Sequence, residues 1–266
     1  MSVTIAFANQ KGGVGKSTFT LQTAFFAKEH QLKTLVIDLD GQGNTSTKIA
    51  GRESIKSLEA SSSNITRSYQ LFDPNLSSPV PLTCDNGIDL IPALINDSKL
   101  YAKEATDLSD ILIPKKQIDK IIENYDIVLV DCPPSLGRLL MSGLIISKKI
   151  IIPVAVSGFA VDGVSGLFDV ISSIKAKINP ELEISGVFVN NFNVRSNQHK
   201  KSVLALRESV GDLLLDTVVG NRSPIDQATN NGSPVWKLRS GAAAKASNEI
   251  QSVIKEVFNR TGVIYE

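Results

Sequence analysis

A glycine-rich loop between two lysines is the part of this sequence with the clearest chemistry. In such a loop, glycines let successive backbone N–H groups turn inward on a phosphate chain, and the helix that follows adds a positive dipole. Lys16 is expected to neutralise the β- and γ-phosphates of a nucleotide, and the Ser17 hydroxyl to ligate Mg²⁺. The strict pattern G-x-x-x-x-G-K-[ST] fails because Gln10 stands at its first position, and K-G-G-x-G-K-[ST] is present instead. The predicted nucleotide-binding residues of the loop are Lys11, Gly12, Gly13, Val14, Gly15, Lys16, Ser17 and Thr18.

Carboxylates follow two further apolar runs. The run 34–38 leads into Asp38-Leu39-Asp40, and the run 127–131 ends in Asp131. Asp131 is predicted to hold Mg²⁺ through water, and Asp40 to orient the water that attacks the γ-phosphate, a catalytic role beside that of Lys16. For Asp38 two alternatives stay open, a direct part in nucleotide binding or a buried hydrogen bond that caps a turn.

These residues need strands and helices that alternate along the chain. Short β-branched runs, several of them almost continuously apolar, are typical of parallel strands covered on both faces. Strand alternating with helix predicts right-handed crossovers and a doubly wound α/β fold, with a mostly parallel sheet and helices on both faces. Ligands bind such sheets at the carboxyl ends of the strands. Strands are predicted at 3–8, 34–38, 88–92, 127–131, 150–154, 184–190 and 217–219, and helices at 17–29, 116–124, 136–147, 162–177, 200–210 and 242–259.

Length and composition favour one globular unit. The 266 residues are 42% hydrophobic and 21% charged, which suits a buried core and argues against disorder. We predict one domain over 1–266, in which 52–86, rich in Ser, Asn and Pro, is an irregular surface excursion. A net charge of +1 provides no global field that would hold the protein on DNA or on an anionic membrane. Two cysteines and the lack of a secretion signal predict a cytoplasmic protein.

Six segments carry a similarity to a known family. Four carry most of it, and the first three of these are highly specific: KGGVGKST at 11–18, VIDLDGQGNTS at 36–46, DIVLVDCPPSLG at 126–137 and IIIPVAVSGFAVDG at 150–163. INPELEISGVFVNN at 178–191 and GSPV at 232–235 add weaker similarity, so that the likeness spans nearly the whole chain. With these segments the sequence resembles the ParA/MinD-type ATPases, P-loop proteins with a deviant Walker A motif, and among them the short ParA partition proteins.

The resemblance implies a slow Mg²⁺-dependent ATPase that a partner protein stimulates. In that family the first lysine of the loop, here Lys11, reaches the partner's phosphates in a nucleotide-sandwich homodimer, so that ATP switches dimerisation. The resemblance also implies ATP-dependent DNA binding without sequence preference, a ParB-like centromere-binding partner, and a cytoplasmic protein that joins the nucleoid when ATP is bound. Plasmid or chromosome segregation is the implied outcome. Short members begin at the phosphate loop, as here, which predicts no N-terminal helix-turn-helix domain.

The family also suggests contacts for the base and for DNA. Asn190 or Asn191 is expected to bond the adenine, with the loop 219–225 closing over it, although both asparagines suit a turn equally. Gly41 stands where the family commonly has proline, which predicts a looser loop around Asp40. DNA contacts are expected from C-terminal cations, any one of which a solvated helix face explains as well: Arg195, Lys200, Lys201, Arg207, Arg222, Lys237 and Arg239.

Other functions remain alternatives at this point. A related ATPase that positions a protein cargo would carry the same motifs. A MinD-like membrane-cycling ATPase needs a basic amphipathic C-terminal helix, whereas the tail has only Lys255 and Arg260 as cations, so no stable membrane association is expected. A small-molecule ligase or the nitrogenase iron protein shares this loop, but Cys84 and Cys132 do not suit a cluster-bridging pair. The intact motif residues disfavour a binding module with a dead site.

Overall fold

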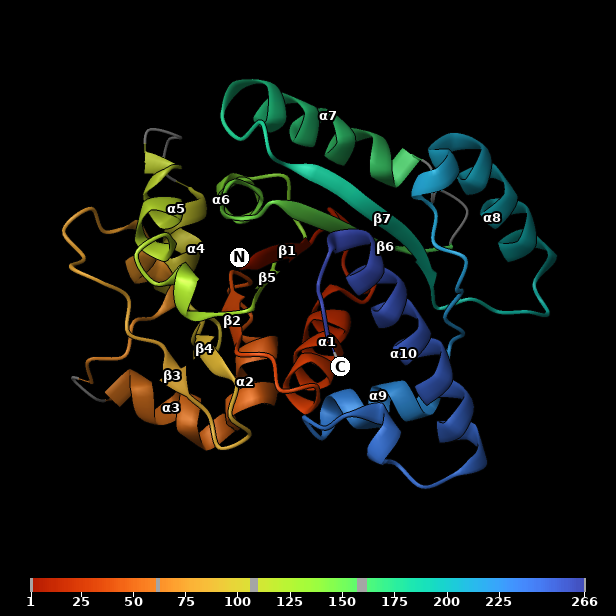
Figure 1. The fold of residues 1–266 in the computed structure, drawn as a ribbon, viewed down its shortest axis with the longest axis horizontal. Coiled ribbons are helices and arrows are strands. Elements are labelled where there is room, and N and C mark those ends of the chain that lie inside the picture. The colour runs from red at the N-terminus through yellow and green to blue at the C-terminus, as the bar shows by residue number, and fades with distance from the viewer. Residues whose placement is uncertain (1, 61–62, 106–109, 157–161, 266) are drawn as a thin grey trace.

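The computed structural model describes residues 2–60, 63–105, 110–156 and 162–265. Within these residues, seven strands form one sheet in the order β3-β4-β2-β5-β1-β6-β7 (Figure 1). All neighbouring strands of the sheet are parallel except β3 and β4, which are antiparallel. The strands are β1 Val3–Phe7, β2 Thr34–Asp38, β3 Leu82–Thr83, β4 Asp89–Ile91, β5 Ile127–Asp131, β6 Lys149–Ala155 and β7 Glu183–Asn190.

Helices cover both faces of the sheet, which confirms the doubly wound α/β fold. On one face lie α1 and α10, and on the other lie α6 and α7 (Figure 1). The helices are α1 Lys16–Glu29, α2 Asn44–Ala50, α3 Arg52–Ala60, α4 Ser98–Glu104, α5 Ile113–Ile118, α6 Arg138–Ile146, α7 Asp162–Lys177, α8 Asn197–Val210, α9 Ser223–Asn230 and α10 Gly241–Thr261. No helix within the described ranges has the length and apolar character needed to cross a bilayer.

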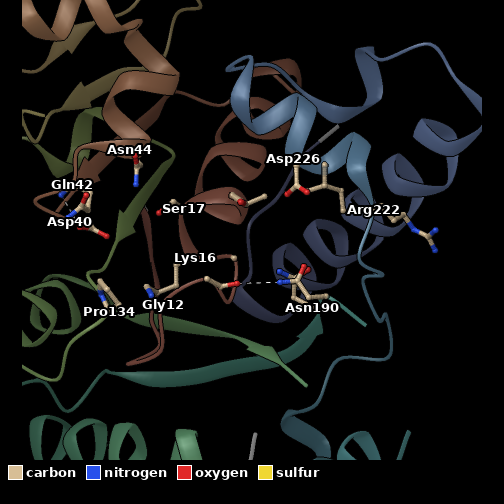
Figure 2. Close-up of a pocket in the computed structure, with 15 residues that line it drawn as sticks. Gly12, Lys16, Ser17, Asp40, Gln42, Asn44, Pro134, Asn190, Arg222 and Asp226 are labelled. Carbon is tan, nitrogen blue, oxygen red and sulfur yellow. Dashed lines mark hydrogen bonds between the residues drawn. The ribbon is translucent and has the colours of Figure 1, made fainter. Parts of the chain in front are cut away.

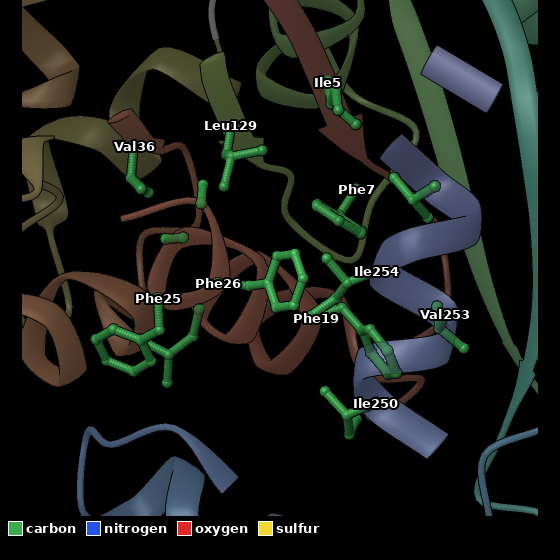
Figure 3. Close-up of a cluster of buried hydrophobic side chains, with 14 of the residues drawn as sticks. Ile5, Phe7, Phe19, Phe25, Phe26, Val36, Leu129, Ile250, Val253 and Ile254 are labelled. Atoms are coloured by element: carbon green, nitrogen blue, oxygen red, sulfur yellow. The ribbon is translucent and has the colours of Figure 1, made fainter. Parts of the chain in front are cut away.

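The apolar runs of the strands form two buried layers, one on each face of the sheet. Side chains of a strand point alternately to its two faces. Ile5 and Phe7 of β1 therefore pack with Phe26 of α1 and Ile254 of α10 (Figure 3), whereas Ala6 joins the layer beneath α6 and α7. Because both faces are covered, the sheet is held firmly and the loops at its carboxyl edge start from rigid strand ends.

The predicted strand at 217–219 is wrong. This segment runs beside β7, and the amides of Leu215 and Val219 each donate a hydrogen bond to that strand at 2.8 Å. Between them the amide of Thr217 donates instead to the carboxylate of Glu256 on α10, at 3.1 Å. A parallel ladder needs evenly spaced backbone bonds, and a side chain has taken one of them. Only isolated bridges remain.

The structure also corrects the region that looked irregular. It starts with α3 and holds the short edge strand β3, neither of which was predicted. The expected helix 116–124 is divided into α5 and a 3₁₀ turn at Ile122–Asn124, and α2, α4 and α9 were not predicted at all. These helices have at most nine residues, too few for apolar periodicity to stand out. Residues 61–62, and 157–161 of the similarity segment 150–163, lie outside the described residues.

Candidate functional site

The predicted chemical residues meet at one edge of the sheet. Strand β5 lies between β1 and β2, and Asp131 is the register partner of both Phe7 and Asp38. The loops that leave these strand ends surround a cavity of about 440 Å³ (Figure 2). Predicted residues that line it are Gly12, Gly13, Gly15, Lys16, Ser17, Thr18, Asp40, Asn190, Asn191 and, from the loop 219–225, Arg222 and Ile225. Residues that were not predicted are Gln42, Asn44, Pro134 and Asp226.

The phosphate loop is clamped from the end of β7. Gly15 has φ 105°, a left-handed conformation that glycine adopts without strain, and α1 begins directly after it. A Cβ at Gly15 would lie 2.4 Å from Nδ2 of Asn190, so the loop also needs glycine there for space. Asn190 Nδ2 donates to the Val14 carbonyl at 2.9 Å, and Asn191 Nδ2 donates to the Gly13 carbonyl at 3.3 Å. The two asparagines expected at the adenine therefore brace the loop in this structure.

Lys16 is held inside the loop. Its side chain is buried, and its Nζ donates to the Lys11 carbonyl at 3.0 Å. Burial lowers the pKa of Lys16, while the nearby charge of Asp131 acts in the opposite direction. Lys11 is half-buried and does not line the cavity, and its own amide donates to Asn9 Oδ1 at 3.0 Å. A buried ammonium with one backbone acceptor is therefore available to an anion that enters the loop.

Asp131 combines complete burial with an unused acceptor. Thr45 of α2 donates its hydroxyl to Oδ2 at 2.6 Å, and Oδ1 has no hydrogen-bond partner within the described part of the chain. Burial raises the pKa of Asp131 to about 6, against the lowering effect of the hydroxyls of Thr45 and Ser17. An orphaned buried carboxylate oxygen is an acceptor that metal-bound water satisfies. The described residues contain no group of three or more His, Cys, Asp or Glu side chains able to hold a metal ion, so further ligands would have to come from Ser17 and from the nucleotide.

Asp38 lies behind the cavity and does not line it. Its Oδ2 accepts hydrogen bonds from the amide and the hydroxyl of Ser46, at 2.9 and 2.7 Å, and its Oδ1 accepts one from the Asp40 amide at 3.1 Å. Burial, together with the charge of Asp131, raises the pKa of Asp38 well above its usual value. Of the two alternatives for Asp38, the structure has the buried hydrogen bond that holds a turn. The hydroxyl residues Thr45 and Ser46 follow the aspartate pair in the sequence, which is the signal that could have identified them.

Asp40 faces the cavity from a braced loop (Figure 2). Its Oδ1 accepts the Gln42 amide at 3.0 Å. The loop was expected to be loose at Gly41, but the Gly41 carbonyl accepts the Asp97 amide at 2.8 Å, and the ring of Tyr101 lies against Gly41. The expectation of a looser loop is therefore wrong, because a tyrosine packs where proline was expected.

The seven C-terminal cations proposed for DNA contact differ in their surroundings. Arg222 forms two hydrogen bonds with Glu249, at 2.6 and 2.5 Å, and Arg207 and Lys237 each lie within 4 Å of a carboxylate. These three cations already have acidic partners. The other four are exposed and form no ion pair with any carboxylate that the structure describes: Arg195, Lys200, Lys201 and Arg239. Arg195 lines a second hollow of about 520 Å³ with Lys245, a cation that was not predicted.

Asp131→Asn is expected to stabilise the ligand-free protein. The folded pKa of about 6 exceeds the ordinary 3.8, so the ionised carboxylate opposes folding at pH 8 and ceases to do so below pH 4. Removal of this charge should raise the free energy of unfolding by about 1–3 kcal/mol at pH 8. Urea unfolding with EDTA at both pH values measures this, and the gain should shrink as the pH falls towards 4. A gain of the same size at both would contradict it.

The chain is similar to known proteins over most of its length. The family model described as "AAA domain" matches residues 2–184. The chain is 27% identical to the chromosome-partitioning ATPase Soj of Treponema pallidum, over 98% of this chain and 99% of that protein. Solved structures that share the fold include the following two. A plasmid partition protein of Borrelia burgdorferi has a TM-score of 0.71 at 22% identity, over 96% of this chain and 99% of that one. The cobyrinic acid a,c-diamide synthase of Mycobacterium smegmatis, with bound ATP analog and magnesium, has a TM-score of 0.73 at 22% identity, over 96% and 95%.

The family model covers more than half of the chain. The motifs at the carboxyl ends of β1, β2 and β5 are those on which the resemblance was based. The relative from Treponema pallidum is similar over its whole length. The chain therefore belongs to the AAA domain family, and within it to the ParA/MinD-type ATPases.

Proposed function

We propose that this protein is a ParA-like partition ATPase. ATP with Mg²⁺ would join two copies of the chain into a sandwich homodimer that binds DNA without sequence preference. Hydrolysis, stimulated by a ParB-like partner, would release the DNA and drive the segregation of a plasmid or chromosome. The observation that carries the proposal is the meeting of Lys16, Ser17, Asp40 and Asp131 at one sheet edge, within or directly behind one cavity.

Each of these residues has a role in that proposal. The loop amides and Lys16 would hold the phosphates, and Ser17 and, through water, Asp131 would hold Mg²⁺. When bound, Mg²⁺ neutralises charge on the phosphate oxygens. The second carboxylate oxygen of Asp40 accepts no hydrogen bond from the described residues, so it is available to orient a water molecule. Lys11 would act across the dimer, on the partner's nucleotide.

Relatives support the choice of ligand and process. The Treponema pallidum relative is named a chromosome-partitioning ATPase, and the Borrelia burgdorferi protein of the same fold is a plasmid partition protein. The Mycobacterium smegmatis synthase holds an ATP analog and magnesium in this fold. By extension we propose a cytoplasmic protein that associates with the nucleoid when ATP is bound.

Membrane cycling, the alternative within the family, has less support. The apolar face of α10 is buried against α1 and the sheet, through residues such as Ile250, Val253 and Phe258. A helix that anchors to a membrane needs an apolar face that is free to enter the lipid. Transport of a protein cargo would use the same site and differs only in the partner.

Co-sedimentation with non-specific DNA tests the proposal. We expect binding with ATP and Mg²⁺, little binding with ADP, and an affinity that falls steeply as salt rises, because counterions are released from the DNA. Liposomes of anionic lipid, sedimented under the same conditions, should not bind the protein. Equal DNA binding with ATP and ADP, or binding to the liposomes alone, would contradict the proposal.

A further inference from the structure

Helix α4 touches two loops of the site that are far apart in the sequence. One is the loop after β2, which carries Asp40, and the other is the loop after β5, which leads from Asp131 into α6. The helix is short, and Asp97 caps it by accepting the Leu100 amide at 3.0 Å. Asp97 also donates its own amide to the Gly41 carbonyl at 2.8 Å. The start of α4 is thus already tied to the Asp40 loop.

The side chain of Tyr101 packs against the Asp40 loop and accepts a hydrogen bond from it. A Cβ on Gly41 would lie 2.6 to 2.9 Å from three carbons of the Tyr101 ring, closer than such atoms approach in real proteins. The ring therefore occupies the place of the missing side chain. The Tyr101 hydroxyl also accepts a hydrogen bond from Gln42 Nε2 at 2.7 Å. Gln42 in turn donates its amide to Oδ1 of Asp40, so Tyr101 touches both residues that follow the proposed water-orienting carboxylate.

Glu104 holds the loop after β5 through hydrogen bonds. One carboxylate oxygen accepts the Ser135 hydroxyl at 2.8 Å, and the other accepts the Leu139 amide at 2.7 Å, in the first turn of α6. A Cβ on Gly137 would lie 1.9 Å from a Glu104 oxygen. Gly137 has φ −85°, which any residue adopts, so glycine is needed there for space and not for its backbone conformation.

The contacts of Tyr101 and Glu104 with the two loops come from one helix and therefore act together. Tyr101 and Glu104 are three residues apart in one helix, so their side chains lie on the same face. Each of them covers a glycine in a loop that leaves the carboxyl end of a strand, β2 in one case and β5 in the other. A helix moves as a unit, and a displacement of α4 would therefore shift both loops together.

We propose that Tyr101 and Glu104 are positioning residues, and that α4 uses them to hold the Asp40 and Asp131 loops in the arrangement needed for hydrolysis. This inference rests on the proposed ATPase function. The phosphate loop receives its braces from Asn190 and Asn191 of the β7 end, on the other side of the cavity. Loss of the α4 contacts should therefore lower the rate of hydrolysis and leave the affinity for ATP almost unchanged.

Hydrogen exchange in the nucleotide-free protein tests the bracing directly. Tyr101→Leu should speed exchange of the Gln42 and Gly43 amides by about tenfold, because opening of the loop becomes easier. Tyr125→Phe is the matched control, since Tyr125 also forms a hydroxyl hydrogen bond, to Asp89 at 2.9 Å, away from the cavity. Unchanged exchange in Tyr101→Leu would overturn the proposal.

The second loop has its own variant and control. Glu104→Ala should speed exchange of the Leu139 amide by a similar factor, and Glu104→Gln, which keeps an acceptor, should restore most of the protection. Asp126→Asn is the matched control, because Asp126 accepts the Lys33 amide at 2.7 Å at the opposite end of β5. Protection that is lost equally in Glu104→Ala and in the control would contradict a local brace.

Steady-state ATP hydrolysis tests the consequence. Tyr101→Leu and Glu104→Ala should each lower kcat about tenfold with KM within about twofold, because small misplacements of reacting groups are costly. Gly41→Ala should lower kcat as well, and combined with Tyr101→Leu it should cost no more than the larger single effect. Lower melting temperatures with kcat unchanged would overturn the proposal. If the wild-type chain hydrolysed no ATP, the proposed function would fail, while the exchange experiments would still decide whether α4 braces the loops.

Discussion

Lys16→Ala should lower the affinity for ATP by at least about 100-fold, corresponding to about 3 kcal/mol. The ammonium of Lys16 is buried in the loop, where it donates a hydrogen bond to the Lys11 carbonyl, so a phosphate oxygen would meet a cation that is poorly solvated. Charge-assisted hydrogen bonds of this kind are the strong ones. Titration calorimetry with ATP and Mg²⁺ measures the loss, and circular dichroism confirms that the variant remains folded. An affinity like that of the wild type would remove the phosphate-loop assignment.

Lys11→Ala is the matched lysine control. Lys11 lies in the same loop, but it contributes its backbone carbonyl to Lys16 and does not line the cavity. Its alanine variant keeps that carbonyl, and should bind ATP with nearly unchanged affinity. Light scattering should show that it fails to dimerise with ATP, since the charge proposed to act on the partner's phosphates is gone. Dimerisation at wild-type levels would contradict the role of Lys11 across the dimer.

Asp40→Ala should lower kcat about 100- to 1,000-fold while ATP still binds. Asp40 lines the cavity and has one carboxylate oxygen that accepts no hydrogen bond from the described residues, and Lys16 and the loop amides do not depend on it. ATP that binds and is not hydrolysed should trap the dimer. Single-turnover hydrolysis, with light scattering for the dimer, measures both effects.

Asp73→Ala is the control for Asp40. Asp73 makes the same local turn, in which Oδ1 accepts the Asn75 amide at 2.9 Å, outside the cavity. Its loss should affect stability slightly and leave hydrolysis unchanged. A similar loss of kcat in both variants would mean that the loss in Asp40→Ala is not specific to a carboxylate at the cavity. A monomer with ATP in Asp40→Ala would contradict the dimer switch.

Much of the fold followed from local pattern. Parallel strands buried on both faces appear as short apolar runs, and the ends of β2 and β5 were predicted at the residues where the structure has them. The segment 217–219 has the same composition but forms no strand, because the amide of Thr217 donates its hydrogen bond to the carboxylate of Glu256 and not to β7. Such competition between backbone and side chain involves residues far apart in the chain, and no local pattern records it.

For the site, too, local pattern predicted some features and contacts between distant residues decided others. The order of glycines and lysines at 11–18 and the position of Asp131 at a strand end were sufficient to predict a phosphate-binding edge, because parallel strands place their carboxyl ends together. The role of Asp38 stayed open, since a buried hydrogen bond and a nucleotide contact need the same residue at the same place. The tertiary structure adds the buried hydrogen bonds from Ser46, which no local pattern predicted.

The sequence by itself determined the chemistry of this protein, through residue types at short spacing in one loop and at two strand ends. The tertiary structure decided which distant groups hold those residues. Asn190 braces the phosphate loop, and Tyr101 and Glu104 reach glycines about 60 and 33 residues away. These contacts depend on how the strands are ordered in the sheet and on which side chains then face each other. That order is set by the packing of the whole chain, so neither Gly41 nor Gly137 could be explained before the position of α4 was known.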